Sequence, residues 1–296
     1  MRVLSIGSLN IDIVVQIEDF PELDSEVLIK DLYEMHGGSA ANFAVALSKL
    51  GMNVSFFGAV GNDVYGDLLK KELDRNKVDT SYLKNVEGKS GLVVVLVDKT
   101  GENRMFAYRG ANKNLNPDDL NKDFLSLFDW IHVASVERDI IMKVCKYCGK
   151  LSYSPGSIMV DFGLDYIEDI FNYCKYVFLN KGEALKLFGE NLEEAKRYRS
   201  EFIITLGKQG SLLIGKETIR CKGYEVEVVD TTGAGDSFAA GFIYGILNYD
   251  VKKALKLANA CAALKTTKIG ARNSPTLSEV LSFLRERDED CSDFLG

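Results

Sequence analysis

The sequence predicts an α/β fold in which helices cover both faces of a mostly parallel sheet, with a small separate sheet beside it. Short apolar runs alternate with helical patterns along most of the 296 residues, which is typical of parallel sheets. The region near residues 90–112 breaks this alternation with two consecutive β-rich runs. With 46% hydrophobic residues, a chain of this length can also bury a large core.

Short apolar runs locate the strands of the main sheet. In chain order they cover residues 3–6, 54–60, 130–136, 158–162, 176–179, 202–206 and 211–214, and a further β-like run covers 225–229. Helical patterns follow several of these runs, at 41–50, 65–76, 181–188 and from residue 238 onward. Gly51 is a typical C-terminal stop for the first helix, and in the second helix Leu68, Leu69 and Leu73 share one side.

The small sheet is predicted from four β-rich runs. Residues 90–98 and 103–108 flank the turn signal Lys99-Thr100-Gly101-Glu102, which favours a hairpin. Residues 11–15 and 26–33 are also β-rich. Together these runs could form a sheet that covers a pocket. The charged run 285–293 is expected to be a frayed, solvated end.

Composition argues against several classes of function. The net charge of −7, from 36 Lys and Arg against 43 Asp and Glu, argues against an extended nucleic-acid partner. The longest purely apolar run, residues 92–97, is far shorter than the roughly 20 residues of a membrane helix. The first residues lack the pattern of a signal peptide. We therefore expect a cytoplasmic protein without a membrane partner.

The six cysteines are scattered, which in a cytoplasmic chain indicates free thiols. Cys145 and Cys148 form a C-x-x-C pair, but no second pair or nearby His completes a zinc site. Two thiols on one face of a helix are the simpler interpretation. His36 and His132 do not have the spacing of metal ligands, and structural roles are expected for both.

The segment with the strongest functional signal is Asp230-Thr231-Thr232-Gly233-Ala234-Gly235-Asp236. It opens a predicted helix, whose N-terminus carries a partial positive charge. Its small residues Gly233, Ala234 and Gly235 allow backbone N–H groups to converge on an anion. Asp236 would repel that anion unless it accepts a proton from an attacking hydroxyl, which is the arrangement that phosphoryl transfer requires. The alternative is that Asp236 only caps its helix.

Two segments nearer the N-terminus could bind a polyol. Gly37-Gly38-Ser39-Ala40-Ala41-Asn42 leads into a helix, where the Asn42 amide could meet a hydroxyl; a tight turn is the alternative. Gly7-Ser8-Leu9-Asn10-Ile11-Asp12 follows the first strand, and ligands of open parallel sheets bind at the carboxyl ends of strands. Asp12 could accept hydrogen bonds there, or it could form an Asx turn.

Three further charged side chains are candidates. Glu183, in Asn180-Lys181-Gly182-Glu183, follows a strand and could serve Mg²⁺ through water, or it could only favour the helix dipole. Glu137 could meet a sugar hydroxyl or be an ordinary surface residue. Arg109, near the small sheet, could contact an acidic or larger substrate, or it could be exposed.

Taken together, these segments resemble the ribokinase-like carbohydrate kinases, the phosphofructokinase-B type. The resemblance extends from about residue 3 to residue 274 and rests on the Asp-Thr-Thr-Gly-Ala-Gly-Asp and Gly-Gly-Ser-Ala-Ala-Asn segments. It implies a single kinase domain over residues 1–296, built as a three-layer α/β sandwich with a β-sheet lid from segments near 11–36 and 90–112. It also implies transfer of the γ-phosphate of ATP to a hydroxymethyl group of a sugar or nucleoside.

The resemblance assigns roles by motif. It makes Asp236 the general base and the N–H groups of Gly233, Ala234 and Gly235 the anion hole. On the sugar side it implies Asp12, Gly38, Asn42 and Glu137, to which we add the neighbouring Asn10, Gly37 and Arg109. On the nucleotide side it implies Asn180 and Glu183 for Mg²⁺ and phosphate, with Thr205, Leu206, Gly207, Gly210, Gly235 and Asn259. Asp230, Thr232, Lys265, Lys268, Gly270 and Ser274 match a loop that often binds a monovalent cation such as K⁺, mostly through backbone carbonyls.

The acceptor stays open in this comparison. Ribokinases usually carry Gly-Gly-Lys-Gly-Ala-Asn, where this chain has Ser39 and Ala40, but several sugar and nucleoside kinases have the Ser form. Ribose is the first expectation, with fructose, 2-keto-3-deoxygluconate or a nucleoside such as adenosine or cytidine as alternatives. A phosphorylated sugar is less expected, because no basic cluster is evident. ATP and Mg²⁺ are the expected cofactors, although another nucleoside triphosphate or ADP could be the donor, and a homodimer through the lid is expected.

Two other classes of function fit the sequence less well. A non-catalytic sugar sensor would be expected to have lost the base or the Gly-Ala-Gly turn, and this chain keeps both. An NAD-dependent oxidoreductase would be expected to carry a G-x-G-x-x-G fingerprint after its first strand, and this chain does not.

Overall fold

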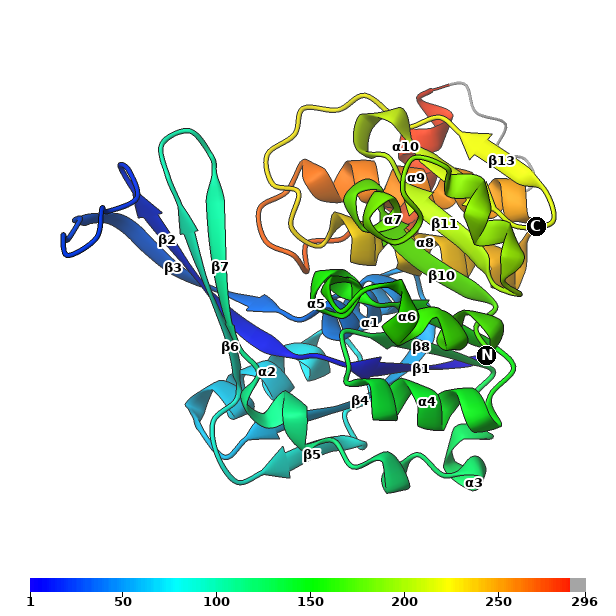
Figure 1. The fold of residues 1–296 in the computed structure, drawn as a ribbon, viewed down its shortest axis with the longest axis horizontal. Helices are drawn as coiled ribbons and strands as arrows, with labels where there is room; N and C mark the ends of the chain where they lie inside the picture. Colours follow the sequence, from blue (N-terminus) through cyan, green and yellow to red (C-terminus); the bar gives the residue numbers. More distant parts are fainter. Residues whose placement is uncertain (288–296) are drawn as a thin grey trace.

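The central sheet of the computed structural model, which describes residues 1–287, has nine strands in the order β13-β12-β11-β10-β9-β8-β1-β4-β5 (Figure 1). The strands from β11 to β5 pair in parallel, whereas β12 and β13 are antiparallel additions at one edge. The strands are β1 (Arg2–Gly7), β4 (Asn53–Gly61), β5 (Leu83–Val86), β8 (Trp130–Ala134), β9 (Leu151–Ser154), β10 (Tyr176–Asn180), β11 (Glu201–Thr205), β12 (Ser211–Ile214) and β13 (Thr218–Cys221). The predicted, mostly parallel sheet is confirmed.

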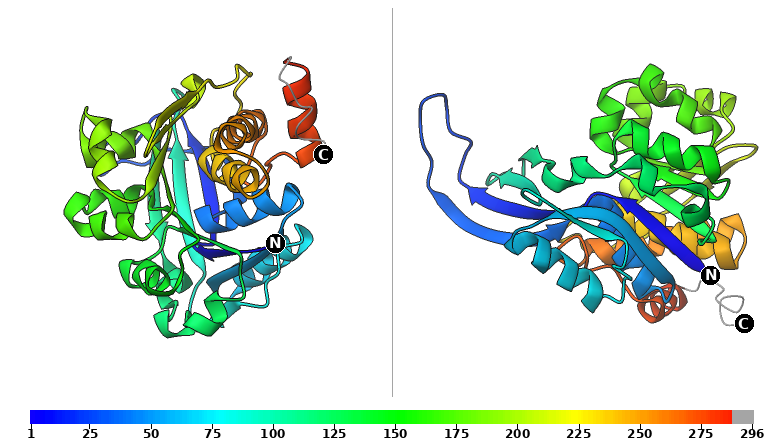
Figure 2. Two further views of the ribbon diagram at one scale, coloured as in Figure 1. Left: turned by 90° about the vertical axis from the view of Figure 1, so that its right-hand side faces the viewer. Right: turned by 90° about the horizontal axis from the view of Figure 1, so that it is seen from below.

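Helices cover both faces of this sheet (Figure 2). One face carries α1 (Ser39–Lys49), α2 (Val64–Arg75), α8 (Ala234–Asn248), α9 (Val251–Thr266) and α10 (Leu277–Arg285); the other carries α3 (Lys122–Leu125), α4 (Arg138–Tyr147), α5 (Gly156–Asp161), α6 (Leu164–Ile167) and α7 (Lys181–Phe188). Side chains of a strand alternate between faces, so Val3 packs in one core while Leu4 and Ile6 pack in the other. Short 3₁₀ helices lie at Gly110–Asn114, Pro117–Asp119, Glu168–Asn172, Leu192–Arg197 and Gly207–Gln209.

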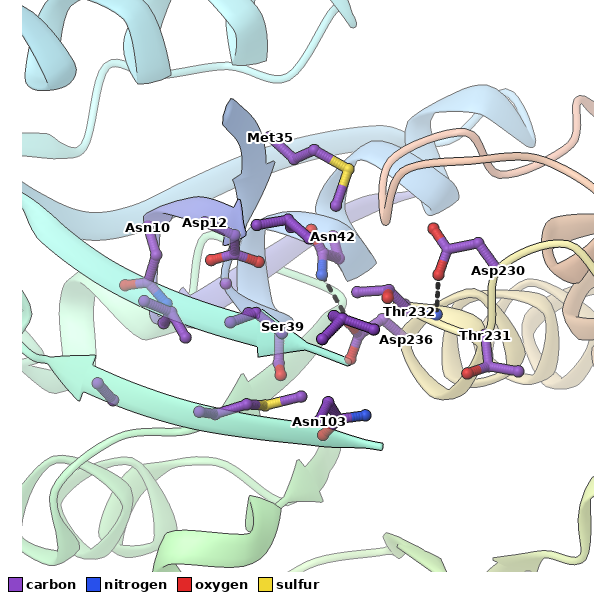
Figure 3. A pocket seen from close by; sticks show the side chains of 18 of the residues that line it. Asn10, Asp12, Met35, Ser39, Asn42, Asn103, Asp230, Thr231, Thr232 and Asp236 are labelled. Carbon is purple, nitrogen blue, oxygen red and sulfur yellow. Dashed lines mark hydrogen bonds between the residues drawn. The ribbon is translucent and has the colours of Figure 1, made fainter. Parts of the chain in front are cut away.

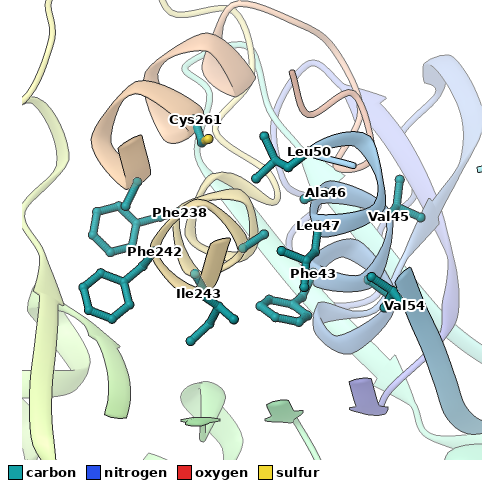
Figure 4. Close-up of a cluster of buried hydrophobic side chains, with 14 of the residues drawn as sticks. Phe43, Val45, Ala46, Leu47, Leu50, Val54, Phe238, Phe242, Ile243 and Cys261 are labelled. Carbon is teal, nitrogen blue, oxygen red and sulfur yellow. The ribbon is translucent and has the colours of Figure 1, made fainter. Parts of the chain in front are cut away.

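The core between α1 and α8 fixes the position of the α8 N-terminus (Figure 4). Phe43 of α1 and Phe238 and Phe242 of α8 are buried against the central sheet, where they contact aromatic side chains of β8 and β10. Burying each such ring contributes about 1.5–3 kcal/mol. Helix α8 also packs closely on α9, since a Cβ on Gly245 would lie 2.4 Å from the Cα of Ala254. The functional segment at the start of α8 is therefore held by a rigid core.

A smaller sheet projects from this body, in the order β3-β2-β6-β7 (Figures 1 and 2). Its strands are β2 (Asn10–Ile17), β3 (Ile29–Gly37), β6 (Gly91–Val97) and β7 (Asn103–Tyr108). The chain passes from β1 into β2 after two residues, so the small sheet starts at the carboxyl edge of the large one. This confirms the separate small sheet, although β3 starts three residues later than the run at 26–33 suggests.

Two predicted strands are wrong. Residues 158–162 lie mostly in α5, and the strand of that region is β9, seven residues earlier. Periodicity alone does not distinguish a short apolar run in a strand from one in a helix. Ile158 is exposed while Met159 and Val160 are buried, which is the one-sided pattern of a helical turn. Gly156, with a φ of 73°, supplies the turn that starts this helix.

The predicted β-like run at 225–229 is also wrong, because residues 222–229 form no strand. Val228 and Val229 are more than half exposed, and the Val229 N–H bonds to the carbonyl of Thr266 at the end of α9. Val228 and Val229 line a cavity and do not pair with a neighbouring strand.

The remaining sequence predictions concern the cysteines, the C-terminal end and membrane spans. Cys145 and Cys148 are free thiols, but Cys148 is the residue that ends α4, so the pair does not share a helix face. In the charged run 285–293, residues 288–293 lie outside the described residues. Within residues 1–287, every helix is too short or too polar to cross a bilayer.

Candidate active site

A cavity of about 700 Å³ lies where the small sheet faces the N-terminus of α8 (Figure 3). The small sheet supplies one wall, with Asn10 and Asp12 of β2. The start of α1 and the turn before α8 supply the other polar groups, among them Asn42 and Asp236. The structure thus brings together residues from three segments that the sequence separates by more than 220 positions.

Asp236 is placed in the first turn of α8, with its carboxylate facing the Asn42 amide. The Asn42 Nδ2 donates a hydrogen bond of 2.9 Å to the Asp236 Oδ2 (Figure 3). Burial raises the pKa of Asp236 to about 6; the Asn42 hydrogen bond opposes this rise, and the charge of Glu183 adds to it. A carboxylate with a pKa near neutrality, held in one orientation, is suited to act as a general base.

The turn before α8 is shaped to leave N–H groups open to the site. Gly233 adopts the left-handed conformation with a φ of 76°, and a Cβ on it would lie 2.5 Å from the carbonyl oxygen of Ala271. Gly235 has no neighbouring atom within 4 Å of where its Cβ would be. The first N–H groups of a helix have no partner inside it, but the Ala234 N–H donates to the Thr231 carbonyl at 3.1 Å. Of the three predicted donors, Gly233 and Gly235 therefore leave their N–H groups where an anion can approach.

Asp12 has a buried carboxylate oxygen without a partner. Its Oδ1 has no hydrogen-bond partner among the described residues. Burial raises the pKa of Asp12 to about 6, the Arg272 guanidinium lowers it, and the charge of Asp236 raises it again. An unpartnered buried acceptor costs about 1–3 kcal/mol, and a ligand hydroxyl that donates to it would remove that cost.

Arg272 organises the site, and the sequence analysis missed it. Its guanidinium is buried, donates to the Asn42 Oδ1 at 3.3 Å and to the Gly37 carbonyl at 2.7 Å, and pairs with Glu72 of α2. By occupying the oxygen of the Asn42 amide, it turns the NH₂ group toward Asp236. Its position in the sequence could have indicated a role, because Arg272 lies between Gly270 and Ser274, which were both predicted to belong to the cation loop.

The other sugar-side glycine, Gly38, is the residue before α1. Its φ of 96° and the 2.5 Å that would separate its Cβ from the Ser8 carbonyl exclude a side chain. This close approach sets α1 against the end of β1 and so places Asn42. Asn10 is oriented by the buried Asn112, whose Nδ2 donates to the Asn10 Oδ1 at 2.8 Å.

Arg109 and Glu137, which the sequence analysis treated separately, form an ion pair. The Arg109 Nε lies 3.3 Å from the Glu137 Oε1, and its Nη2 donates to the Ser135 carbonyl at 3.3 Å. Arg109 lines the cavity, and it is the only cationic side chain among the described residues that do. Ser135 also lines the cavity and has a φ of 53°, an uncommon conformation for a residue other than glycine.

Most of the predicted nucleotide-side residues lie at the carboxyl ends of β10 and β11, outside this cavity, whereas Gly235 is in α8 and Asn259 is in α9. Asn180 and Thr205 are register partners, and Leu206 and Gly210 close the turn that contains Gly207, with the Leu206 N–H bonded to the Gly210 carbonyl. The side chain of Asn259 is buried and donates to the Lys222 carbonyl at 3.1 Å.

Asn180 and Glu183 form a capping box at the start of α7, each side chain accepting from the other's backbone N–H at 2.9 Å. The pKa of Glu183 is raised by burial, and its charge acts on Asp236. No group of three or more metal-ligating side chains is found in residues 1–287. Mg²⁺ commonly uses one or two carboxylates plus substrate phosphates, and Glu183, whose charge reaches Asp236, is a ligand of that type.

The predicted cation loop contains a buried ammonium. Lys265 Nζ donates to the carbonyls of Asp230 and Lys268, at 3.0 Å each. The Asp230 carboxylate accepts from the N–H groups of Thr232 and Gly270, at 2.8 and 2.7 Å. The Ser274 Oγ is buried and has no hydrogen-bond partner among the described residues.

Comparison with known proteins gives a consistent result. Residues 1–277 match the family model described as pfkB family carbohydrate kinase. An ATP-dependent ribose-1-phosphate kinase from Halopiger xanaduensis is 33% identical, over 97% of this chain and 99% of its own. A ribokinase structure from Thermotoga maritima has a TM-score of 0.86 and 28% identity, over 96% and 99% of the two chains. A structure of Arabidopsis thaliana ribokinase complexed with ribose and ATP has a TM-score of 0.85 and 26% identity, over 96% and 98%.

Proposed function

The chain belongs to the pfkB family of carbohydrate kinases, and on this premise we propose that it transfers the γ-phosphate of ATP to a primary hydroxyl of a small sugar, with ribose as the preferred acceptor. The observation that carries this proposal is the Asp236 carboxylate, which Asn42 orients at the N-terminus of α8 and which faces a polar cavity. Asp12 and Asp236, two of the three aspartates that line that cavity, favour a neutral acceptor rich in hydroxyls over an acidic one.

Asp236 accepts the proton of the acceptor hydroxyl while the hydroxyl oxygen attacks the γ-phosphorus. The new oxygen–phosphorus bond forms as the bond to the oxygen bridging the β- and γ-phosphorus breaks, and ADP leaves. The backbone N–H groups of Gly233 and Gly235, with that of Ala234 exchanging its bond to the Thr231 carbonyl, stabilise negative charge on the transferred group. Asp12 accepts hydrogen bonds from the other hydroxyls and holds the sugar in the orientation for attack.

The nucleotide would lie along the carboxyl ends of β10 and β11. Its polar contacts would come from the residues that the resemblance assigns there: Asn180, Thr205, Leu206, Gly207, Gly210 and Asn259. Glu183 would hold Mg²⁺ through water, and the ion would supply positive charge next to the phosphates of ATP. The loop carbonyls of residues 221 and 222 that Asn259 holds would then border the adenine side.

The small sheet would act as the lid of a single kinase domain. It forms one wall of the cavity, so its closure would exclude water and suppress hydrolysis of ATP. It also exposes Leu32, Met105 and Phe106, each more than half accessible, and apolar patches of this kind mark contact surfaces. We propose a homodimer through this sheet, which light scattering after gel filtration tests directly: a monomer at micromolar concentration contradicts it.

The test of the kinase is release of ADP from Mg-ATP over a panel of acceptors: ribose, ribose 1-phosphate, fructose, 2-keto-3-deoxygluconate, adenosine and cytidine. The expected result is the highest kcat/KM with ribose, and loss of turnover with every acceptor in Asp236→Asn. Turnover that survives in Asp236→Asn removes the general base from the proposal. A preference for adenosine or cytidine assigns the protein as a nucleoside kinase instead.

Ribose 1-phosphate is the second candidate acceptor, because Arg109 places a guanidinium on the cavity wall. One Arg can bind a phosphate by two parallel hydrogen bonds, although here Glu137 already pairs with it. If the acceptor is ribose 1-phosphate, Arg109→Gln raises its KM at least tenfold and leaves the KM for ribose within twofold. Equal changes for both sugars show that Arg109 only supports the wall. Arg104→Gln, which changes an exposed arginine of the same strand region away from the cavity lining, is the matched control.

A further inference from the structure

We propose that the side-chain ammonium of Lys265 acts as a built-in monovalent cation beneath the phosphate-binding turn, so that this enzyme does not depend on K⁺. The inference rests on the proposed kinase function for its activity measurement only. It concerns the loop whose residues were expected to surround an ion, mostly through backbone carbonyls. The residues present do not fit that expectation, because one of them brings its own charge into the ring.

The geometry shows a complete ammonium site. The side chain of Lys265 has no exposed surface, and its Nζ lies 3.0 Å from each of the carbonyl oxygens of Asp230 and Lys268. The Oδ2 of Asp230 is 3.9 Å away. These oxygens belong to the ring in which K⁺ was expected. The ammonium therefore takes two of the carbonyls that a cation would need.

The charges in this loop also argue against a second cation. Lys265 and Asp230 balance each other, and like charges a few ångströms apart in a buried site repel strongly. A K⁺ ion in the ring would have to share the Asp230 and Lys268 carbonyls with the ammonium. Of the expected ligands, the Ser274 Oγ is buried without a hydrogen-bond partner among the described residues, and this one hydroxyl oxygen cannot replace the two carbonyls that the ammonium already holds.

Lys265 is a positioning residue for the turn that carries Asp236. Its contact with the Asp230 carbonyl ties the start of the turn to the loop after α9. That loop also contains Arg272, which orients Asn42. In Figure 3 the hydrogen bond between Asp230 and Thr232 lies close to Asp236. The ammonium thus does the structural work expected of the ion: it fixes the backbone from which the anion cradle begins.

The first test uses the wild-type protein in K⁺, Na⁺ or choline chloride at equal ionic strength. The expected result is a phosphorylation rate and a melting temperature that do not change with the cation. Crystals soaked in thallium are expected to show no anomalous peak in the loop. A rate or melting temperature that rises with K⁺ over choline, or a thallium peak at the Asp230 and Lys268 carbonyls, overturns the proposal.

The second test removes the ammonium. Lys265→Ala leaves two buried carbonyls and the Asp230 carboxylate without their cation, and we expect a lower melting temperature and at least a tenfold lower kcat in choline. K⁺ is expected to restore part of both, because the vacated space lets it reach the carbonyls. Lys252→Ala, an exposed residue at the start of the same helix, is the matched control and should show neither loss nor rescue.

The outcomes of these tests either support or contradict the role of the Lys265 ammonium. A Lys265→Ala protein that equals the wild type in every salt contradicts the proposal, as does one whose loss K⁺ does not reduce. If this variant does not fold in any salt, the wild-type rates and the thallium soak decide. If no acceptor is phosphorylated at all, the proposed kinase function fails, while the melting temperatures and the thallium soak still test the ammonium site.

Discussion

Asp230 and Asp236 lie at the two ends of one seven-residue turn, yet their surroundings are opposite. For Asp230, burial alone would raise the pKa, but hydrogen bonds from Thr232 and Gly270 and the charge of Lys265 lower it. For Asp236, burial dominates and raises the pKa to about 6, with Asn42 only partly opposing it. Hydrogen bonds and the charge of Lys265 compensate the charge of Asp230. The charge of Asp236 is only partly compensated by the protein.

This contrast separates structure from chemistry within one motif. A carboxylate whose hydrogen bonds are complete stabilises the fold and has little left for a ligand. A carboxylate that is buried, oriented and incompletely neutralised destabilises the fold, and that is acceptable only where it serves a function. Asp12, with its unpartnered Oδ1, belongs to the second kind. The three acids therefore divide into one whose charge is compensated and that holds the turn, and two whose burial leaves their charge incompletely compensated.

The largest expected effect is on turnover, when the Asp236 carboxylate is removed. Asp236→Asn removes the proton acceptor but keeps the shape of the side chain, so kcat should fall about 10²- to 10⁴-fold. ATP binding should stay within about threefold, since Asp236 is assigned to the acceptor. Steady-state turnover and calorimetric titration of the nucleotide measure the two quantities. Loss of ATP binding as large as the loss of turnover would mean that Asp236 is part of the nucleotide site instead.

The next effect concerns pH. Asp236 must be ionised to accept a proton, and its pKa is raised to about 6, so kcat/KM should fall about tenfold per pH unit below that value. The measured quantity is kcat/KM for the acceptor from pH 4.5 to 8. Because the charge of Glu183 raises the pKa of Asp236, Glu183→Gln should move the acid limb to lower pH, whatever it does to the maximum rate. A profile that is flat down to pH 5 speaks against Asp236 as the base.

The sequence predicted features that short segments encode, and it missed contacts between segments that are far apart in the chain. The fold class, most strands and the candidate residues Asp236, Asn42 and Asp12 come from runs of a few residues with their own turn chemistry and periodicity. The Arg272–Asn42 hydrogen bond joins residues 230 positions apart, and no pattern within a segment encodes it. The Arg109–Glu137 pair is of the same kind, since the two side chains meet only because the end of β7 and the end of β8 are brought together in the fold.

The misassigned elements have a related cause. The apolar run at 158–162 looked like a strand because burial on both faces of a sheet and burial on one side of a short helix produce similar composition. Lys265 shows the same limit at the level of one residue. Its position in the motif predicts a backbone carbonyl ligand and says nothing of the side chain, whose Nζ donates to the Lys268 carbonyl three positions further on.

A smaller effect is expected at the structural end of the turn. Asp230→Asn leaves one of the two N–H donors of Thr232 and Gly270 facing an NH₂ group and removes the countercharge of Lys265, so the free energy of unfolding should drop by about 1–3 kcal/mol. The pKa of Asp230 is lowered, so the stability that it contributes is present above pH 4 and is lost as pH falls. Urea unfolding at pH 7.5 and at pH 3.5 measures this. A penalty that is equal at both values would show that the charge of Asp230 is unimportant.

The smallest expected effect has the opposite sign. The pKa of Asp236 is raised in the folded protein, so its ionised form opposes folding above pH 6, and the opposition disappears as pH falls toward 4. Asp236→Asn should therefore be more stable than the wild type by about 1–2 kcal/mol at pH 7.5, allowing for partial solvent access, and the difference should vanish near pH 4. Urea unfolding of both proteins across this range measures it, with Asp230→Asn as the control whose effect has the reverse sign and stays constant down to about pH 4. If both variants are destabilised alike at pH 7.5, the two ends of the turn do not differ in the way the structure indicates, and Asp236 is held as tightly as Asp230.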